Sequence, residues 1–572
     1  MIKKFKFLFI TLVIATILSV PTKALAATIN VSPGGSIQTA INSAAAGDTI
    51  MVAPGTYTEF IKINAKKGRA DAPIRIVGTS TDPATYPVLN GGNTGYANNT
   101  DKPVLTITGS SWITLERLKF KNSGLSSVFL DGSHYITIRR NVMDYLKYGI
   151  LLRNKSSHLL MEYNEFFQSY PDSSTWTQLK DSKWEGGALT SFGGAGMNTI
   201  RYNYFHHSFN GIYFGNDGRT GNYYDANVFI YRNRFDNIVD DPFEPESYSF
   251  NNHFFHNTII DSHRIISLAP QNGGTGPVYV YANMMLLTQD PTGEAASGRI
   301  NSAFKLELSP NYYPGGVYLF NNSIDADYTG TNSSGDDMLS STVNNLTQKN
   351  NIFKTLNKVF TSNSLTLKNS VLSGDMSSKS FGYTEPNSYP NTNPLYANPS
   401  GEDLRLGAGS PAISKSLEVI NLTGFVSSPV IVAGSDLGAF KFGENDFRTL
   451  PEPKYVVPPT SGEDASFPAN TSWPADTFGG YNPPYGPAWH VSGKSSFTGT
   501  GGSPSPSPSP SPSPSSKPGD ANGNNIVDGI DYVIWLNHYN QTLSGGSSVG
   551  DFNGSGKVDG IDYVIWLNNY SK

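Results

Sequence analysis

The 572-residue chain contains no cysteine and few charged residues. The absence of cysteine excludes disulfide bonds as a source of stability. Charged residues make up 15% of the chain and its formal net charge is -5, so nothing points to a nucleic acid or an anionic membrane as a partner. Beyond residue 20 no apolar run is long enough to cross a bilayer. The abundance of Gly, Asn, Ser and Tyr favours β structure instead.

The N-terminus has the pattern of a bacterial signal peptide. Lys3 and Lys4 precede an apolar run from Phe7 to Val20, and small residues follow at 24–27. This run is shorter than the ~20 residues that a transmembrane helix needs, which is typical of a cleaved leader and not of an anchor. We therefore expect residues 1–26 to be removed and the mature protein to be secreted, either free or associated with the cell surface.

Short apolar segments centred on an asparagine recur along the chain. The asparagines are Asn141, Asn164, Asn203, Asn233, Asn257, Asn283, Asn322 and Asn351, and they lie 23, 39, 30, 24, 26, 39 and 29 residues apart. The shortest steps match one turn of a coil with three sheets, and the longer ones indicate inserted loops. Asparagine suits a fixed corner because it tolerates the left-handed conformation and because stacked amides can hydrogen-bond along the ladder. The repeat predicts an all-β fold over residues 27–442, a right-handed parallel β-helix.

A short amphipathic helix is expected at the N-terminal end of this solenoid. Ser36 is a good N-cap, apolar residues follow at helical spacing from Ile37 to Ala44, and Gly47 ends the helix. A stack of strands has an open end, and a helix with one apolar face covers it.

Several segments resemble one known family. They are 47–57, 72–76, 404–406, 409–413 and 436–440, the last reading Asp-Leu-Gly-Ala-Phe. On these segments the chain is similar, over about residues 28–442, to the right-handed β-helix proteins that include pectate lyases and chondroitinase-B-like lyases. The resemblance implies the β-helix fold. It leaves the reaction open, because that fold carries lyases, hydrolases, epimerases and non-enzymatic adhesins.

Residues 443–518 are expected to be an irregular region that ends in a spacer of alternating Ser and Pro, from Ser503 to Ser515. Residues 519–572 then contain a duplicated loop followed by an apolar helix. Oxygen ligands stand at calcium-loop spacing, with the position-7 ligand a backbone carbonyl: Asp520, Asn522, Asn524, Ile526, Asp528 and Asp531 in the first loop, and Asp551, Asn553, Ser555, Lys557, Asp559 and Asp562 in the second. An all-oxygen set favours calcium.

This small all-α module resembles a type I dockerin, which implies a cohesin-bearing scaffold as its partner. Asn524 and Ser555 replace the aspartate usual at position 5 of that family's loops, which weakens the expected affinity for calcium. The alternative is a degenerate, calcium-stabilised module that only anchors or spaces the other domain.

Stacking the turns by their apolar alternation places candidate site residues on one face of the β-helix. One inward column is expected to contain Ile150, Leu189, Ile212, Phe243, Ile266 and Phe304. The residues that follow them then face outward. They form a first outward column of Leu151, Thr190, Tyr213, Glu244, Ser267 and Lys305, and a second of Arg153, Gly215, Glu246, Ala269 and Glu307.

Glu244 and Glu246 are two residues apart on a strand, which predicts carboxylates about 7 Å apart. That separation suits acid-base hydrolysis of a glycosidic bond. Asp240 and Asp241 enter the same turn and are expected to raise the pKa of at least one carboxyl. Lys305, about 10 Å along the axis, is a candidate lyase base or ligand for a substrate carboxylate.

A lyase needs a base at the C5 proton of a uronic acid and a cation at its carboxylate. Candidates for the cation are Arg264, Arg153, Lys305 and a calcium ion in the cleft, and candidates for acid-base function are Tyr213, His206 and His207. Tyr213, Arg153 and Glu307 are also candidates for binding substrate. Inserted turns around 168–186 and 286–300 are expected to wall the cleft.

The sequence thus predicts a secreted, monomeric enzyme that degrades a polysaccharide, either a glycoside hydrolase or a polysaccharide lyase, with its cleft between about residues 150 and 310. The alternative is a non-catalytic glycan-binding or surface-adhesion protein that uses the same face. The sugar, the linkage, endo or exo action and the identity of the base are left open.

Overall fold

The computed structural model divides the chain into two compact units, Met1–Gly501 and Gly502–Lys572, which are taken separately below. The described residues are 26–93, 102–171, 174–180, 182, 184–215, 225–246, 249–268, 275–288, 304–306, 316–326, 342–355, 359, 366–368, 370–417, 420–421, 431–432, 436–443, 517–523, 526–527, 529–539, 541–542 and 546–570. The expected leader and almost all of the expected linker therefore lie outside them.

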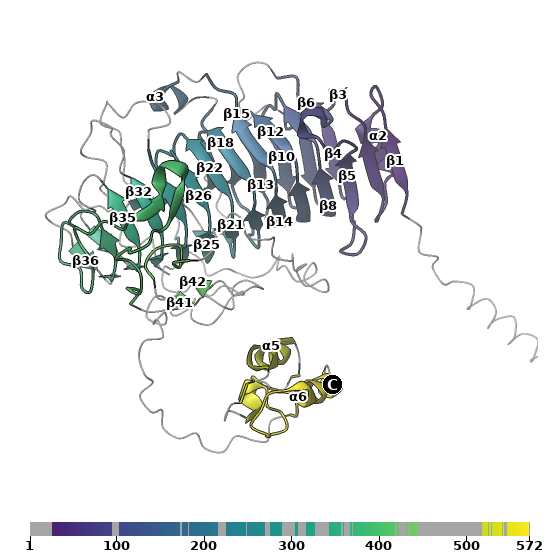
Figure 1. Ribbon diagram of the computed structural model, residues 1–572. Coiled ribbons are helices and arrows are strands. Elements are labelled where there is room, and N and C mark those ends of the chain that lie inside the picture. Colours follow the sequence, from purple (N-terminus) through teal and green to yellow (C-terminus); the bar gives the residue numbers. More distant parts are fainter. Residues whose placement is uncertain are drawn as a thin grey trace, which may run out of the picture. The chain divides into compact units, whose positions relative to one another are not determined.

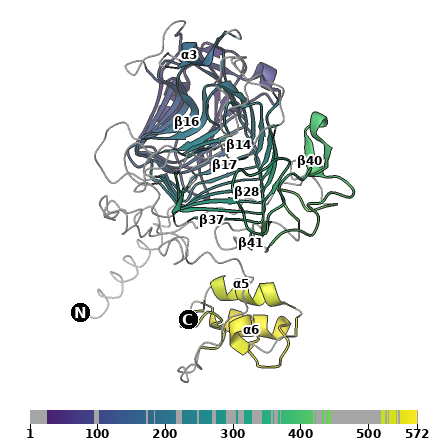
Figure 2. The same cartoon turned by 90° about the vertical axis from the view of Figure 1, so that its left-hand side faces the viewer.

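The first unit is a parallel β-helix whose turns each contribute strands to three long sheets (Figures 1 and 2). In its described part the 13-stranded sheet runs β1 (Thr28–Val31), β2 (Thr49–Val52), β5 (Ile74–Gly78), β8 (Ser111–Glu116), β11 (His134–Arg139), β14 (Ser157–Glu162), β17 (Thr199–Arg201), β21 (Phe229–Tyr231), β25 (Asn252–Phe255), β28 (Val278–Tyr281), β31 (Val317–Phe320), β34 (Leu346–Lys349) and β37 (Val371–Ser373). The 9-stranded sheet runs β4 (Ile61–Asn64), β7 (Leu105–Thr108), β10 (Ser126–Asp131), β13 (Tyr148–Arg153), β16 (Gly187–Ser191), β19 (Asn210–Phe214), β23 (Phe243–Pro245), β27 (Ile266–Leu268) and β30 (Phe304–Leu306). The 12-stranded sheet runs β3 (Thr56–Tyr57), β6 (Val88–Asn90), β9 (Lys119–Lys121), β12 (Val142–Tyr145), β15 (Glu165–Gln168), β18 (Tyr204–Ser208), β22 (Arg234–Ile238), β26 (Thr258–Ile260), β29 (Met284–Leu286), β32 (Ser323–Ala326), β35 (Ile352–Thr355) and β38 (Met376–Ser377).

The core is the interior of the coil, and parallel pairing stacks one turn's apolar residues on the next. Along the 9-stranded sheet, Ile150 pairs with Leu189, Leu189 with Ile212 and Ile212 with Phe243. The series continues from Phe243 through Ile266 to Phe304, and every member is at most 1% exposed. The predicted inward column and the predicted fold class are therefore confirmed.

The expected N-terminal helix is present as α2 (Ile37–Ser43). The Ser36 hydroxyl accepts a hydrogen bond from the backbone N–H of Thr39, as an N-cap does. Ile37, Ala40 and Ile41 are buried in the same core cluster as β1 and β2. Their apolar stripe covers the open first turn of the solenoid.

A continuous ladder of asparagine side chains fixes one corner of the coil. It starts at Asn141, passes through Asn164, Asn203, Asn233, Asn257, Asn283 and Asn322, and reaches Asn351, where Asp375 ends it. At each step the side-chain Nδ2 of one asparagine donates to the Oδ1 of the next, 2.9–3.2 Å away. The same Oδ1 accepts the preceding asparagine's backbone N–H, so the ladder satisfies backbone and side-chain groups that are buried.

One part of the asparagine interpretation was wrong. The left-handed conformation belongs to the residue before each ladder asparagine, for example Arg140 (φ 53°), Tyr163 (φ 57°) and Arg232 (φ 53°). The asparagine itself points its Nδ2 inward to a main-chain carbonyl, as Asn141 does to Leu115 O at 3.1 Å. Asparagine is therefore required for its paired donor and acceptor, not for its backbone freedom.

The C-terminal part of the unit covers the outer face of the 12-stranded sheet at its last turns. A second core cluster joins Ile260, Met284 and Ile352 of that sheet to Leu404, Leu437 and other residues from later in the chain. This segment includes β39 (Tyr396–Asn398) and β40 (Asp403–Leu406), which pair antiparallel. Earlier turns of the sheet carry polar and aromatic residues outside, among them Glu165, Tyr204 and His206.

The remaining described elements of this unit are short. They are α3 (Trp176–Leu179), η1 (Pro83–Thr85), η3 (Pro399–Gly401) and the paired strands β20 (Asp225–Ala226) with β24 (Ser249–Phe250), β33 (Thr342–Asn344) with β36 (Thr366–Lys368), and β41 (Ile420–Asn421) with β42 (Ile431–Val432). In the part of the chain that the structure describes, no helix has the length and apolar character to cross a membrane.

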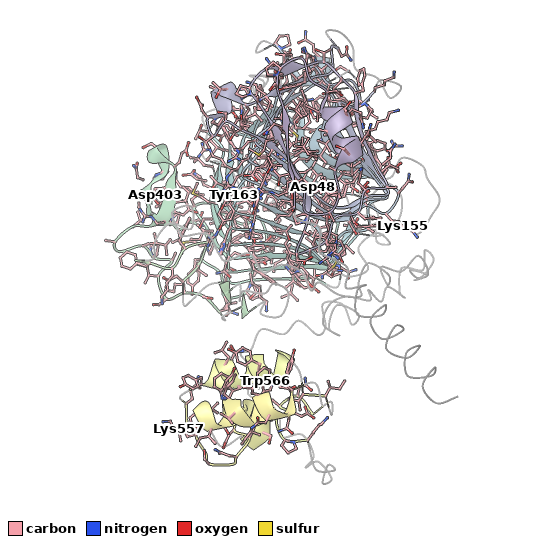
Figure 3. All side chains as sticks on the ribbon, turned by 90° about the vertical axis from the view of Figure 1, so that its right-hand side faces the viewer. Asp48, Lys155, Tyr163, Asp403, Lys557 and Trp566 are labelled. Carbon is pink, nitrogen blue, oxygen red and sulfur yellow. The ribbon has the colours of Figure 1, made fainter. Side chains whose placement is uncertain are left out.

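The second unit contains helices α5 (Gly529–His538) and α6 (Gly560–Asn569) and the 3-10 turn η7 (Gly546–Val549). Aromatic residues from both helices meet, with the rings of Tyr532 and Trp566 5.0 Å apart and those of Trp535 and Tyr563 5.1 Å apart; Figure 3 labels Trp566. The Trp535 Nε1 also donates to the Asp559 carbonyl at 2.8 Å, which ties the first repeat to the second.

Replacement of Asn257 with alanine is expected to destabilise the β-helix by about 3 kcal/mol, because it leaves the buried N–H groups of Asn233 without their acceptor. The measurement is the thermal unfolding midpoint of the full chain. Asn64→Ala is the control, since Asn64 is an exposed strand residue and its loss should change the midpoint little. Equal midpoints for the two variants would contradict this account of the ladder.

Candidate active site on the nine-stranded sheet

The first outward column has the predicted register, but it does not face solvent throughout as expected, because Leu151, Thr190 and Ser267 are fully buried. Tyr213 pairs with Thr190 on one side and with Glu244 on the other, and Ser267 pairs with Lys305. The Phe243–Ile266 pair places Glu244 next to Ser267 in the adjacent turn. Because side chains alternate along a strand, burial of the preceding apolar residue directs each of these side chains to the outer face.

Glu244 and Glu246 both belong to the acidic cluster, and burial together with the charge of Glu246 raises the pKa of Glu244. Each has a fixed neutral partner: Asn210 Nδ2 donates to Glu244 Oε2 at 2.8 Å, and Ser267 Oγ donates to Glu246 Oε1 at 3.0 Å. The expected separation of about 7 Å between the two carboxylates stays a prediction.

Asn210 also fixes the neighbouring acidic turn. Its Oδ1 accepts the backbone N–H of Asp241 at 3.1 Å, so one amide connects Asp241 with Glu244. Asp241 is 1% exposed, Glu246 2% and Glu244 9%, so the cluster is almost completely shielded from solvent. Sequence reasoning missed Asn210, whose only signal was a polar residue at the start of a strand beside the acidic turn.

The expected cations are placed around this cluster at different depths. Lys305 Nζ is 3.8 Å from Glu246 Oε1, and its side chain remains 27% exposed. The backbone N–H of Arg264 donates to the Asp240 carbonyl at 3.2 Å. Burial raises the pKa of Asp241, and the guanidinium charge of Arg264 partly offsets that rise.

A further cation near the cluster, Lys180, was missed. Its Nζ contacts Glu185 Oε1 at 2.8 Å and Asp240 Oδ2 at 3.8 Å. It follows α3 within the long inserted turn that was expected to wall the cleft, and the rings of Trp176 and Phe209 lie 5.6 and 5.4 Å from its Nζ. The step of 39 residues between Asn164 and Asn203 includes an insertion between β15 and β16 that has no register, so the sequence could not place this lysine.

The predicted substrate-binding residues lie along the same sheet or outside the described chain. The Arg153 guanidinium stacks over the Phe192 ring at 5.6 Å, and the Phe192 ring meets the edge of Tyr213 at 5.7 Å. Burial raises the pKa of Tyr213, and so does the charge of Glu244. Glu307 lies outside the described residues, as does Ala269.

Desolvation dominates the electrostatics of the acidic cluster. Burial raises the pKa of Glu244 well above its usual value, and the charge of Glu246 raises it further. Burial also raises the pKa of Glu246, against the lowering effect of Lys305. The pKa of Asp241 is raised by burial and by the charge of Asp240. A buried pair of carboxyls of this kind holds a proton at a pH where a solvated glutamate has lost it.

His206 and His207, considered as acid-base groups, are not part of this site. Both belong to β18 of the 12-stranded sheet, whereas the acidic column belongs to the 9-stranded sheet. His206 Nε2 contacts Glu165 Oε1 at 3.1 Å. The sequence spacing did not separate the two faces, because both histidines lie only a few residues before β19.

The two loops of the second unit gather oxygen atoms around buried carboxylates. Asp531 Oδ1 accepts the backbone N–H groups of Ala521 and Asn522, and Asp562 Oδ1 accepts that of Asn553. These contacts close each loop from its last position back to its start.

The position-1 and position-12 carboxylates of the loops, Asp520, Asp531, Asp551 and Asp562, are all at most 2% exposed. Asp559 accepts from the backbone N–H of Ile561 and so caps α6. Buried carboxylates closed into a loop with amide, hydroxyl and carbonyl oxygens fit a hard cation such as calcium.

Asn524 and Asp528 of the first loop lie outside the described residues. Over the described part of the chain, no group of three or more His, Cys, Asp or Glu side chains is arranged to hold a metal ion. This finding is compatible with calcium binding by the two loops of the second unit, because oxygens of Asn, Ser and the backbone complete their ligand sets. The calcium ion that was expected in the cleft as one option stays a prediction.

Two family matches cover the two units. Residues 103–283 match the family described as "Right handed beta helix region", and residues 518–570 match "Dockerin type I domain". The chain thus combines a right-handed β-helix with a type I dockerin domain. A search of curated protein sequences finds no match.

Solved structures with a similar arrangement are distant. Pectate lyase Pel9A is 13% identical, with 73% of this chain and 96% of that chain covered and a TM-score of 0.42. An alginate lyase from Paenibacillus sp. str. FPU-7 is 15% identical, with 64% and 96% covered and a TM-score of 0.37. PfbA, a surface adhesin of Streptococcus pneumoniae, is 14% identical, with 60% and 79% covered and a TM-score of 0.39.

Glu244→Gln is expected to stabilise the protein more at pH 8 than at pH 4.5. The raised folded-state pKa means that Glu244 favours the folded state fully only below the unfolded value of about 4.5, and this contribution is lost as the pH rises toward the folded-state pKa. Glutamine does not ionise and still accepts from Asn210. The measurement is the difference in unfolding midpoint between variant and wild type at both pH values. A difference that stays constant or shrinks at pH 8 would contradict the raised pKa.

Proposed function

We propose that the protein is an extracellular enzyme that cleaves a uronate-containing polysaccharide by β-elimination at the column formed by Tyr213, Glu244, Ser267 and Lys305. The observation that carries the proposal is the Glu244–Glu246 pair, which is buried and has raised pKa values, 3.8 Å from a partly exposed lysine. Such a pair offers one ionised and one protonated carboxyl at the same place.

The exposed cation supplies the first requirement of elimination. Lys305 Nζ faces Glu246 but keeps 27% of its side chain accessible, so it can bind the carboxylate of a uronate residue. Neutralising that carboxylate makes the C5 proton more acidic. Lys180 holds positive charge close to Glu246 and Asp240, and Arg264 holds it close to Asp241, which offsets the repulsion between the acidic cluster and an anionic substrate.

The carboxyl pair supplies the base and the acid. The ionised member takes the proton from C5, the C–H electrons form the C4–C5 double bond, and the bond from C4 to the glycosidic oxygen breaks. The protonated member gives its proton to that oxygen as it leaves. The pair is left with the former base protonated and the former acid ionised, and transfer of that proton from the one carboxyl to the other restores the starting state.

The cation beside the pair favours elimination over hydrolysis. Lys305 Nζ is 3.8 Å from Glu246 Oε1, where it can neutralise a uronate carboxylate. Elimination needs such a cation, whereas hydrolysis by two carboxyls does not.

A second candidate function is glycan binding without cleavage. The burial of Asp241, Glu246 and Glu244 favours it, because a reacting carboxyl must reach the substrate. Tyr213 and Lys305 would then present the contact surface. This candidate differs from the first in yielding no product.

The dockerin domain is proposed to bind two calcium ions and to attach the enzyme to a cohesin-bearing scaffold outside the cell. Support comes from the match over residues 518–570 and from the four buried aspartates at the first and last loop positions. The leader-like N-terminus supports export.

The proposed reaction is tested by incubating the protein with pectic, alginate, glycosaminoglycan and neutral hemicellulose substrates. Ultraviolet absorbance from the new double bond should appear together with reducing ends, and only on uronate-containing polymers. Glu244→Gln and Glu246→Gln should each lower kcat by about 100-fold or more, as loss of an acid-base group does.

Glu402→Gln is the matched control, since Glu402 pairs with Arg234 on the 12-stranded sheet and its loss should leave the rate unchanged. Reducing ends without absorbance would replace elimination with hydrolysis. No product on any polymer, with retained glycan binding, would favour the second candidate.

Calcium binding is tested by titration calorimetry of the full chain after chelation. Two ions per chain are expected, and Asp531→Asn or Asp562→Asn should each remove one, because each aspartate closes its own loop. Asp403→Asn, whose carboxylate pairs with Arg405, serves as the control and should bind two. An unchanged stoichiometry in both loop variants would disprove the assignment of the sites.

A further inference from the structure

Two adjacent histidines on β18 direct their rings at each other. Successive residues of a strand normally point to opposite faces. His207 has φ of 45°, in the left-handed region, and this breaks the alternation. As a result, a hydrogen bond joins His206 Nδ1 and His207 Nδ1 at 3.0 Å, with the two rings at 89°.

The separation of these two nitrogens suits a shared metal ion. Imidazole nitrogens bind a transition metal at about 2.0–2.1 Å, and two ligands 90–110° apart are then about 2.9–3.4 Å from each other. The observed Nδ1–Nδ1 distance of 3.0 Å is within this range. A bound ion takes the place of the proton that the two nitrogens share in this hydrogen bond.

His206 is held in the tautomer and orientation that metal binding needs. Its Nε2 contacts Glu165 Oε1 at 3.1 Å, and that hydrogen bond is the main cause of the lowered pKa of Glu165. With the proton on Nε2, neutral His206 presents a lone pair at Nδ1. A carboxylate behind a ligand histidine is the usual second partner at metal sites.

Stacking on both sides restricts the His206 ring further. Phe167 lies 5.1 Å away and Tyr204 4.3 Å away, both nearly parallel to it. His207 is exposed, which leaves a path for an ion from solvent. The pair therefore combines one preorganised ligand with one accessible ligand.

We propose that His206 and His207 form a binding site for a divalent transition-metal ion on the outer face of the 12-stranded sheet. Two imidazole nitrogens select copper, nickel or zinc over the hard cations of the dockerin loops, and copper should bind most tightly. Solvent or an oxygen group of a ligand completes the coordination. The site belongs to a different sheet from the acidic column, so it stands or falls independently of the proposed enzymatic function.

The test uses the full chain saturated with calcium, to which one equivalent of Cu²⁺ is added, and electron paramagnetic resonance as the readout. Splitting from two directly bound nitrogens is expected. His207→Asn should abolish the two-nitrogen signal while keeping the backbone conformation, which asparagine tolerates. His206→Phe should do the same while preserving the stack between Phe167 and Tyr204.

Two further variants separate the site from general copper affinity. Glu165→Gln should keep the two-nitrogen signal but weaken the affinity for Cu²⁺ by about tenfold or more, as loss of a ligand's supporting carboxylate does. His538→Gln, on α5 of the dockerin domain, should behave as wild type. An unchanged signal in His207→Asn, or no nitrogen-bound copper in the wild type, would overturn the proposal.

Discussion

The hydrogen bond between the amide of one ladder asparagine and that of the next fixes the register of the whole β-helix. Each amide also accepts a backbone N–H, as Asn164 Oδ1 does from Asn141, so a slip of one residue would leave buried donors and acceptors unpaired in several turns. Register then decides which side chains from distant turns become neighbours. Tyr213, Glu244 and Lys305 share a column only because their turns are stacked in this register.

The asparagine ladder stabilises the fold, whereas the acidic column destabilises it. Burial raises the pKa values of Glu244, Glu246 and Asp241, so these groups disfavour folding when they must ionise. Neutral partners reduce the cost, since Asn210 and Ser267 each donate to one carboxyl. A solenoid suits this combination, because each turn is stabilised mainly by its neighbours and a local loss does not spread along the coil.

The sequence predicted what depends on periodicity and missed what depends on rotamers and insertions. The β-helix and the inward and outward columns that contain Phe243 and Glu244 follow from apolar alternation. Helix α2 follows from apolar residues at helical spacing. The hydrogen bonds of Glu244 to Asn210 and of Glu246 to Ser267 depend on side-chain torsions that no spacing determines. Lys180 lies in an inserted turn without register, and the left-handed φ of His207 removes the alternation on which any prediction for β18 relies.

The most direct test of the central claim is to locate a bound substrate fragment by crystallography of Glu244→Gln with a uronate oligosaccharide. The account predicts density across the 9-stranded sheet, with a uronate carboxylate at Lys305 and a glycosidic oxygen at the glutamine. An oligosaccharide bound on another sheet, with the Tyr213–Lys305 column uncontacted, would contradict it.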